Sequence, residues 1–147
     1  MQNAQWQYEP EEHDFPAATT YLSLICDPTL AASLSELLKS VPTVTYQAKD
    51  LLRASELALL EKTNAHVGRD LDKVKRGRKL SPVLLVRGKF QKNRSLIVAD
   101  GYHRICASYW IDENSPIPCR IVDFPRKHAT NNVQRRFSEI STSLLPM

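Results

Sequence analysis

The chain has 147 residues, of which 42% are hydrophobic and 24% are charged, and its formal net charge at pH 7 is +4. A chain of this size can bury the core of one globular domain without metals or disulfides. No apolar run is long enough to cross a bilayer, and the first residues hold acids but no Lys or Arg, which excludes a secretory signal and predicts a cytoplasmic protein with no membrane partner.

The first quarter of the chain predicts an arm, a strand and a helix. Residues 1–16 are polar and acidic and contain two prolines, which indicates an extended N-terminal arm. Residues 17–26 are apolar and partly β-branched, which predicts a strand. Asp27 and Pro28 suit the cap and the first position of an amphipathic helix over 29–40.

The next segment predicts a short strand and a charged helix. Residues 43–47 alternate in polarity and predict the second strand, and residues 50–54 can hold one helical turn. Asn64 suits the cap of a helix over 65–76. Its inner face consists of Val67, Leu71 and Val74. Its outer face is charged and consists of Arg69, Asp70, Asp72, Lys73, Lys75 and Arg76.

Two apolar runs, 82–86 and 95–99, predict strands that are joined by the polar and basic segment 87–94. A connection of this length favours a hairpin, so we expect the two strands to be antiparallel neighbours. A helix over 102–112 and a last strand over 117–122 complete the pattern.

These elements predict the fold class. We expect an α/β (α+β) domain over residues 17–125, with a small mixed sheet and flanking helices. Residues 126–147 turn polar and predict a C-terminal tail, in which residues 132–140 form either a short helix or an ordered segment.

The cysteines and the charges bound the function further. Cys26, Cys106 and Cys119 stand far apart and form no CxxC pair, so we expect reduced thiols and no structural zinc site. Residues 62–94 hold eleven Lys and Arg against two Asp. Such a cluster can attract the phosphate groups of a nucleotide or a nucleic acid, although a solvated helix face and a hairpin loop would have the same composition.

The strand at 95–99 runs directly into the helix at 102–112 through the sequence Asp100-Gly101-Tyr102-His103-Arg104. A strand that passes through glycine into a helix leaves the unpaired amides of the helix N-terminus at the sheet edge. Glycine also allows a sharp turn and the close approach of a ligand, and Arg104 can bind two phosphate oxygens at once. The junction therefore predicts an anion site.

The order of these parts carries a family resemblance. A strand, a hairpin, a second strand, Gly101-x-x-Arg104-x-x-Ala107 on a helix, and the strand IPCRIV resemble the ParB N-terminal and sulfiredoxin superfamily. This superfamily is also labelled ParB-like nuclease and includes the free-serine kinases. The likeness covers roughly residues 64–122. It implies a ParB/sulfiredoxin-like fold that grips nucleotide phosphates through the motif glycine, its neighbours and the arginine.

The resemblance implies the binding residues. Gly101, Tyr102, His103 and Arg104 are the candidates for binding a nucleotide such as ATP or CTP. The resemblance also sets Asn64-Ala65-His66 where ParB-type proteins have an Asn-Pro-Arg loop, so we expect His66 to belong to the same pocket. An ordinary helix cap is the alternative for that segment.

Asp100 and His103 are the candidate catalytic residues. Asp100 suits a magnesium ligand or a general base near a transferred phosphate. Its alternative role is a helix cap that accepts hydrogen bonds from the amides of Tyr102 or His103. His103 suits a donor to a phosphate oxygen, and its alternative role is a partly buried histidine bonded to a carbonyl.

The resemblance also limits the reaction. The free-serine kinases have Asp-Gly before their motif arginine, so an enzyme here would be a nucleotide-dependent phosphotransferase or hydrolase. Sulfiredoxins have a cysteine at the position of Tyr102, so sulfinic-acid reduction is not implied. The residues after Val122 are too few for the helix-turn-helix region that follows this domain in ParB proteins, so sequence-specific partitioning is not implied either.

Two other functions stay open. The basic segment 69–94 suits a nucleic-acid-binding or nuclease module. A non-catalytic interaction protein would keep the glycine turn only as structure. A homodimer is compatible with each of these functions.

Overall fold

The structure is a computed structural model that describes residues 3–88 and 95–125. Within these residues the chain forms five helices and four strands. In chain order they are α1 (Asp14–Leu22), α2 (Pro28–Ser40), β1 (Val44–Gln47), α3 (Ala48–Ser55), α4 (Ala65–Lys75), β2 (Val83–Arg87), β3 (Ile97–Asp100), α5 (Tyr102–Ile111) and β4 (Pro116–Asp123). The predicted α/β class, with a mixed sheet and flanking helices, is confirmed.

The strands form one sheet in the order β1-β4-β2-β3. β4 pairs antiparallel with β1 through its first half and parallel with β2 through its second half. Pro118 lies in the first half, where it faces Thr45 of β1 and has no partner in β2. A residue without a backbone N–H is tolerated there, because only one side of the strand is paired.

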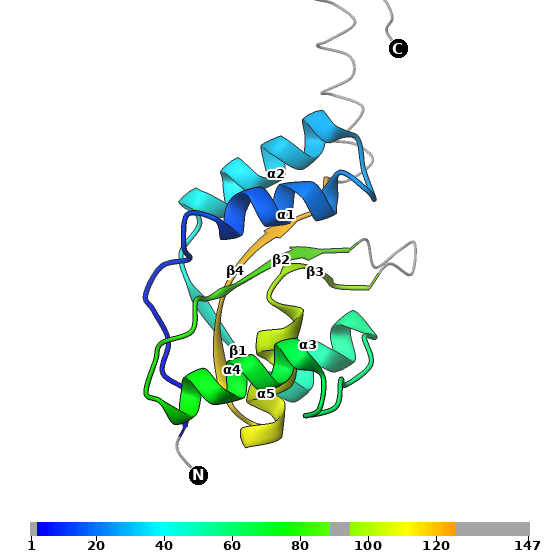
Figure 1. Ribbon diagram of the computed structural model, residues 1–147. Helices are drawn as coiled ribbons and strands as arrows, with labels where there is room; N and C mark the ends of the chain where they lie inside the picture. Colours follow the sequence, from blue (N-terminus) through cyan, green and yellow to red (C-terminus); the bar gives the residue numbers. More distant parts are fainter. Residues whose placement is uncertain (1–2, 89–94, 126–147) are drawn as a thin grey trace, which may run out of the picture.

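The helices cover both faces of the sheet (Figure 1). α1 and α2 pack side by side on one face, and α3, α4 and α5 cover the other. β2 lies between the two helical layers and is buried on both sides. Val83 and Leu85 pack towards α5, whereas Leu84 and Val86 pack towards α1 and α2. This explains why its sequence is continuously apolar instead of alternating.

The predicted strand over 17–26 is wrong, because this segment belongs largely to helix α1. The buried residues Phe15, Ala18 and Leu22 are three and four positions apart, which places them on one side of a helix. The β-branched threonines Thr19 and Thr20 favoured a strand locally. Packing of the apolar side against α2 and the sheet decides the conformation instead.

The other predicted elements are confirmed within one or a few residues. Asp27 accepts a hydrogen bond from the amide of Thr29 at the start of α2, with Pro28 at its first position. Asn64 accepts from the amides of His66 and Val67 at the start of α4. β2 and β3 are antiparallel neighbours, as expected from the hairpin spacing.

Some predicted features fall outside the described residues. The central part of the hairpin loop, residues 89–94, and the tail over 126–147 with its predicted helix over 132–140 are among them. In the described arm, Trp6 forms a single parallel bridge with Leu80 just before β2. No helix of the described chain is both long enough and apolar enough to cross a membrane.

Arg120 of β4 connects the sheet to the end of α2. Its side chain is almost fully buried and donates hydrogen bonds to the carbonyls of Leu38 and Lys39, at 3.1 and 3.0 Å, and to the hydroxyl of Thr43. The last carbonyls of a helix have no partner inside the helix. Arg120 therefore provides donors for two of the last carbonyls of α2.

We expect Arg120→Met to lower the free energy of unfolding by about 2–3 kcal/mol, because the buried hydrogen bond to Leu38 and the partly buried one to Lys39 would be lost. Urea unfolding measures this change. Arg53→Met is the matched control, because Arg53 is exposed and its ion pair with Asp50 is worth less than about 1 kcal/mol. Equal losses in the two variants would contradict the proposed role of Arg120.

Candidate anion-binding site

The predicted anion site lies where β3 passes into α5. β3 ends at Asp100, Gly101 follows with φ at 113°, and α5 begins at Tyr102. This φ is in the left-handed region, which side chains other than glycine adopt at a cost. Glycine at this junction therefore allows the helix to start directly at the end of the strand.

Gly101 also lies against the neighbouring strand. A Cβ atom at Gly101 would stand 2.4 Å from Cγ1 of Val83 in β2 and 3.0 Å from Nη2 of Arg104. No side chain fits in this space. The missing Cβ thus brings the start of α5 against β2 and leaves room for the guanidinium of Arg104.

Arg104 lies one turn into α5 and folds back over the junction. Its Nη2 donates to the carboxylate of Asp100 at 3.0 Å and to the carbonyl of Pro82 at 3.2 Å. The side chains of Arg104 and Asp100 are only 16% and 18% exposed. The Nε of Arg104 is buried and has no hydrogen-bond partner in the described structure. The guanidinium therefore retains unused donors.

The N-terminus of α5 has no side-chain cap. Asp100, the candidate cap, directs its carboxylate to Arg104 instead, so its alternative role as a cap for the amides of Tyr102 or His103 is not observed. Uncapped amides at a helix start carry partial positive charge. They add to the attraction for an anion at this end of α5.

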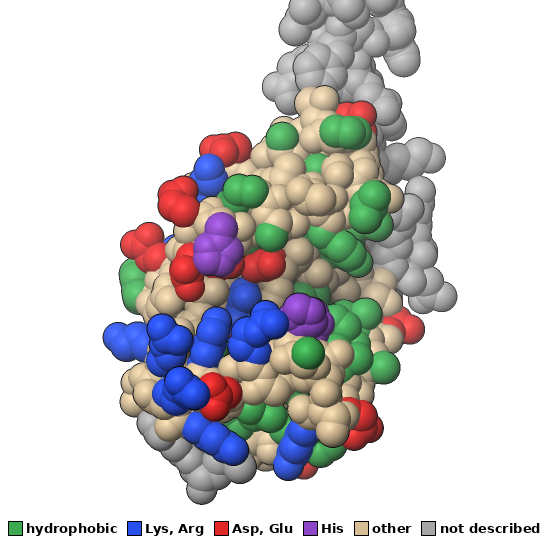
Figure 2. Space-filling view, viewed as in Figure 1, with side chains coloured by type: hydrophobic (Ala, Val, Ile, Leu, Met, Phe, Trp, Pro, Cys, Tyr) green, Lys and Arg blue, Asp and Glu red, His purple; other side chains and the backbone are tan. Residues whose placement is uncertain are grey.

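A cavity of about 190 Å³ opens at this junction. Figure 2 shows Lys and Arg side chains gathered over α4 beside a hollow in the surface, with acidic side chains across from them. The residues that line the cavity come from α4, from the end of β3 and from the start of α5. They are His66, Arg69, Asp70, Lys73, Asp100, Gly101, His103 and Arg104.

The two histidines predicted for this site are neighbours. The ring centroids of His66 and His103 are 4.6 Å apart. Arg69 also approaches His66, with 3.4 Å between its Nη1 and the Nδ1 of the ring. The predicted pairing of His66 with the glycine turn is therefore seen in space, although the two segments are far apart in sequence.

Tyr102 occupies a different position from the other motif residues. Its hydroxyl donates to the carbonyl of Ala58, and its ring stacks beside that of His103 at 5.6 Å. It is not among the described residues that line the cavity. Its contacts hold the His103 ring in place and do not direct the hydroxyl towards a ligand.

Burial shifts the ionisation of several cavity groups. Burial lowers the pKa of His103 below its usual value, and the neighbouring His66 lowers it further. His103 is therefore mainly neutral at pH 7. Burial raises the pKa of Asp70, although the cations around it, Arg104 and Lys73 first among them, oppose the shift.

Asp100 lies near a carboxyl, that of Asp14, as well as near Arg104. Burial raises its pKa, Arg104 opposes this shift, and the buried carboxyl of Asp14 adds to it through charge and a hydrogen bond. A carboxyl close to Asp100 disfavours the ionised form of Asp100, because like charges repel where water is excluded. Asp100 is therefore engaged by Arg104 and by Asp14, and both contacts compete with a role as a free general base.

The arrangement suits an anion better than a cation. Arg69, Lys73 and Arg104 bring three positive charges to the cavity against the two carboxyls of Asp70 and Asp100. Neither His66 nor His103 needs to be charged for this excess.

The predicted magnesium ligand does not find a suitable environment. Asp100 already bonds to Arg104. Among the residues that the structure describes, no group of three or more His, Cys, Asp or Glu side chains is arranged to hold a metal ion. Magnesium in proteins is usually bound by one or two carboxylates that are free to coordinate it. Magnesium therefore stays a prediction, to which we assign no step.

Two acidic residues near the site were not foreseen from the sequence. Asp70 was predicted for the outer face of α4, but it is only 9% exposed. Its spacing from Val67 and Val74, three and four positions away, could have placed it on the inner face. Asp14 could not be found in this way, because its segment precedes the stretch that was predicted to be a strand.

Comparisons with known proteins leave the family open. A scan against protein-family models, a search of curated proteins and a search of solved structures found no match to this chain. The resemblance to the ParB and sulfiredoxin superfamily therefore stays a prediction from the motif and the order of elements.

We expect Gly101→Ala to lower the free energy of unfolding by at least about 2 kcal/mol more than Gly77→Ala does. Both glycines have positive φ, at 113° and 72°, but a Cβ at Gly77 would meet nothing within 4 Å. The difference between the variants therefore reports the contact with Val83. Chemical unfolding of both variants measures it, and equal costs would contradict a close approach at Gly101.

Proposed function

We propose that this cavity binds the phosphate group of a nucleotide such as ATP or CTP. The observation that carries the proposal is the convergence of Arg69, Lys73 and Arg104 on the uncapped start of α5, with His66 and His103 beside them. Anions bind at helix N-termini because the amides and the helix dipole both favour negative charge. Arginine adds paired donors that match phosphate oxygens.

The size of the cavity determines which part of the ligand it receives. Pockets that enclose a drug-sized molecule have volumes of roughly 300–1,000 Å³, whereas this cavity measures about 190 Å³. Phosphate groups would fill it, and the sugar and base would lie on the open surface beside it. The proposal therefore expects weak discrimination between ATP and CTP.

Hydrolysis or transfer of the terminal phosphate is the reaction that such a site would support. Phosphoryl transfer depends mostly on positioning and on stabilisation of charge, and the three cations supply both. A neutral His103 can accept a proton from an attacking hydroxyl or water. Asp100 serves better as the partner that orients Arg104. We place this activity in the cytoplasm, where the sequence predicts the protein to be.

The ion pair between Arg104 and Asp100 favours a second interpretation. A turn that is kept only as structure would also pair its arginine internally, as a non-catalytic interaction protein would do. The unused donors of Arg104 and the two further cations on α4 support binding over this alternative.

The basic side of α4 favours a nucleic-acid surface as a third interpretation. Arg69, Lys73 and Arg76 follow one another at helical spacing, and positive side chains gather over α4 in Figure 2. Binding of this kind would use Arg76, which does not line the cavity, as much as Arg69.

We expect the protein to bind inorganic triphosphate, ATP and CTP, and we expect Arg69→Gln to weaken all three by about tenfold or more. Calorimetric titration measures the affinities. Arg76→Gln is the matched control, because Arg76 lies at the C-terminal end of the same helix but pairs with Asp72, and neither residue lines the cavity. Absence of binding to the unmodified protein would support the structural interpretation.

A further outcome of the same experiment would point to nucleic acid. If the control variant loses as much affinity as Arg69→Gln, the surface of α4 and not the cavity is the binding element. A gel-shift assay with single-stranded DNA at low and high salt would then separate a polymer from a free nucleotide, because each released counterion steepens the salt dependence.

We expect Asp70→Asn to tighten the binding of triphosphate by about tenfold, because it removes a negative charge from the cavity wall. The folded pKa of Asp70 lies above its unfolded value, so its ionised form costs stability as pH rises through that pKa. Removing the charge should therefore leave the protein folded at neutral pH.

Asp72→Asn is the control for this variant. Asp72 lies two residues further along α4, more than half exposed, and bonds to Arg76. A change in affinity of less than about twofold is expected for it, because solvent screens the charge. Unchanged affinity in Asp70→Asn would contradict an anion in the cavity.

A further inference from the structure

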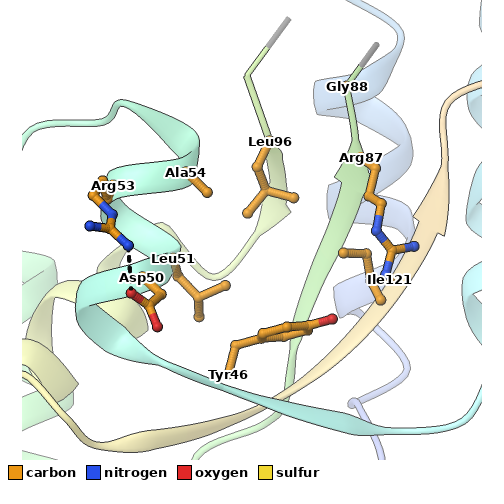
Figure 3. A pocket seen from close by; sticks show the side chains of 9 residues that line it. All are labelled: Tyr46, Asp50, Leu51, Arg53, Ala54, Arg87, Gly88, Leu96 and Ile121. Carbon is orange, nitrogen blue, oxygen red and sulfur yellow. Dashed lines mark hydrogen bonds and ion pairs between the residues drawn. The ribbon is translucent and has the colours of Figure 1, made fainter. Parts of the chain in front are cut away.

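A second cavity, of about 550 Å³, lies between α3 and the sheet. Figure 3 shows it between helix α3 on one side and strands β2 and β4 on the other. Its apolar wall comprises Leu51, Ala54, Leu96, Ile121 and the ring of Tyr46. In the figure Leu96 and Ala54 point into the space, and the Tyr46 ring forms its floor. The volume lies within the range of pockets that enclose small organic molecules.

The two arginines that line this cavity are both in ion pairs, but their acidic partners lie in different places. Arg53 pairs with Asp50 at 3.3 Å, and both residues line the cavity, so they neutralise each other. Arg87 pairs with Asp123 at 2.9 Å, but Asp123 is not among the described residues that line the cavity. What Arg87 offers the cavity is therefore the N–H donors that its bond to Asp123 does not use.

Arg87 is placed to act together with Tyr46. The Tyr46 hydroxyl points across the cavity towards the guanidinium of Arg87 (Figure 3). The bond to Asp123 uses the Nη1 of Arg87, and the planar guanidinium carries further N–H donors. The Tyr46 hydroxyl and the Arg87 guanidinium therefore place hydrogen-bond donors at one end of an apolar cavity.

We propose that this cavity binds a small organic anion, with its apolar body against Leu51, Leu96 and Ile121 and its carboxylate or sulfonate on Arg87 and the Tyr46 hydroxyl. The ligand class differs from that of the phosphate site. An inorganic phosphate would leave the apolar wall exposed to water, whereas an aromatic or aliphatic acid covers the wall and satisfies the arginine at the same time. This inference does not depend on the proposed nucleotide site.

A pair of fluorescent probes tests the apolar contact and the charged contact of the proposal separately. 1-Anilinonaphthalene-8-sulfonate has an aromatic body and a sulfonate, and N-phenyl-1-naphthylamine has the same body without the charge. We expect saturable binding of the sulfonate probe to the folded protein. Arg87→Gln should weaken it by about tenfold and leave the uncharged probe unaffected, because only the charged hydrogen bond is lost.

Two further variants complete the test. Ala54→Phe adds a ring at an exposed position of α3 that borders the cavity, and it should abolish the binding of both probes while near-ultraviolet circular dichroism shows a native fold. The double variant Asp50→Asn/Arg53→Gln removes both members of the other ion pair of the wall without changing its net charge and should change the affinity by less than about twofold.

Three results would overturn the proposal. They are non-saturable fluorescence, equal affinity of the sulfonate probe for Arg87→Gln and the parent protein, and unchanged binding to Ala54→Phe. Competition by benzoate, an aromatic carboxylate without the naphthyl body, would extend the result from the sulfonate to a carboxylate.

Discussion

The arrangement of the candidate site depends on the contact between Gly101 and Val83. A helix that starts one residue after a buried strand can lie against the adjacent strand only if the connecting residue has no side chain and can adopt a positive φ. Gly101 fulfils both conditions, because it has no side chain and a φ of 113°. The consequence is that Arg104 reaches back over the turn to Asp100 and to the Pro82 carbonyl, and that the uncapped start of α5 lies beside the cavity that Gly101 lines. The turn therefore places Arg104, whereas Arg69 and Lys73 reach the cavity from α4.

The site combines opposing charges in a small volume. Three cations alone would repel one another in a partly buried space, and Asp70 and Asp100 reduce that repulsion. The two carboxylates in turn are costly to bury, as the raised pKa of each shows. An incoming phosphate therefore competes with internal acids for the same donors. We infer that affinity is moderate, and that it responds to the charge of the ligand more than to its shape.

The sequence was sufficient to predict those elements whose signals act between residues close together in the chain. The caps Asp27 and Asn64 and the hairpin spacing of β2 and β3 each act over a few residues, and each was confirmed. Helix α1 was not predicted, because its threonines favour a strand locally. Packing against α2 and the sheet determines its helical conformation instead. The contact between His66 and His103 was expected only from a family resemblance. Periodicity alone could not reveal it, because the two rings come from different helices.

The parallel pairing of β2 with β4 has a consequence for how the domain assembles. β3 and α5, which carry the glycine turn, lie in sequence between the two strands, so this pairing closes a loop that contains them. Contacts between residues far apart in sequence are slow to form, because the chain loses conformational entropy before the contact repays it. Helices such as α2, with a local cap, can appear early. The sheet, by contrast, is complete only once β4 has paired with β2 across this loop.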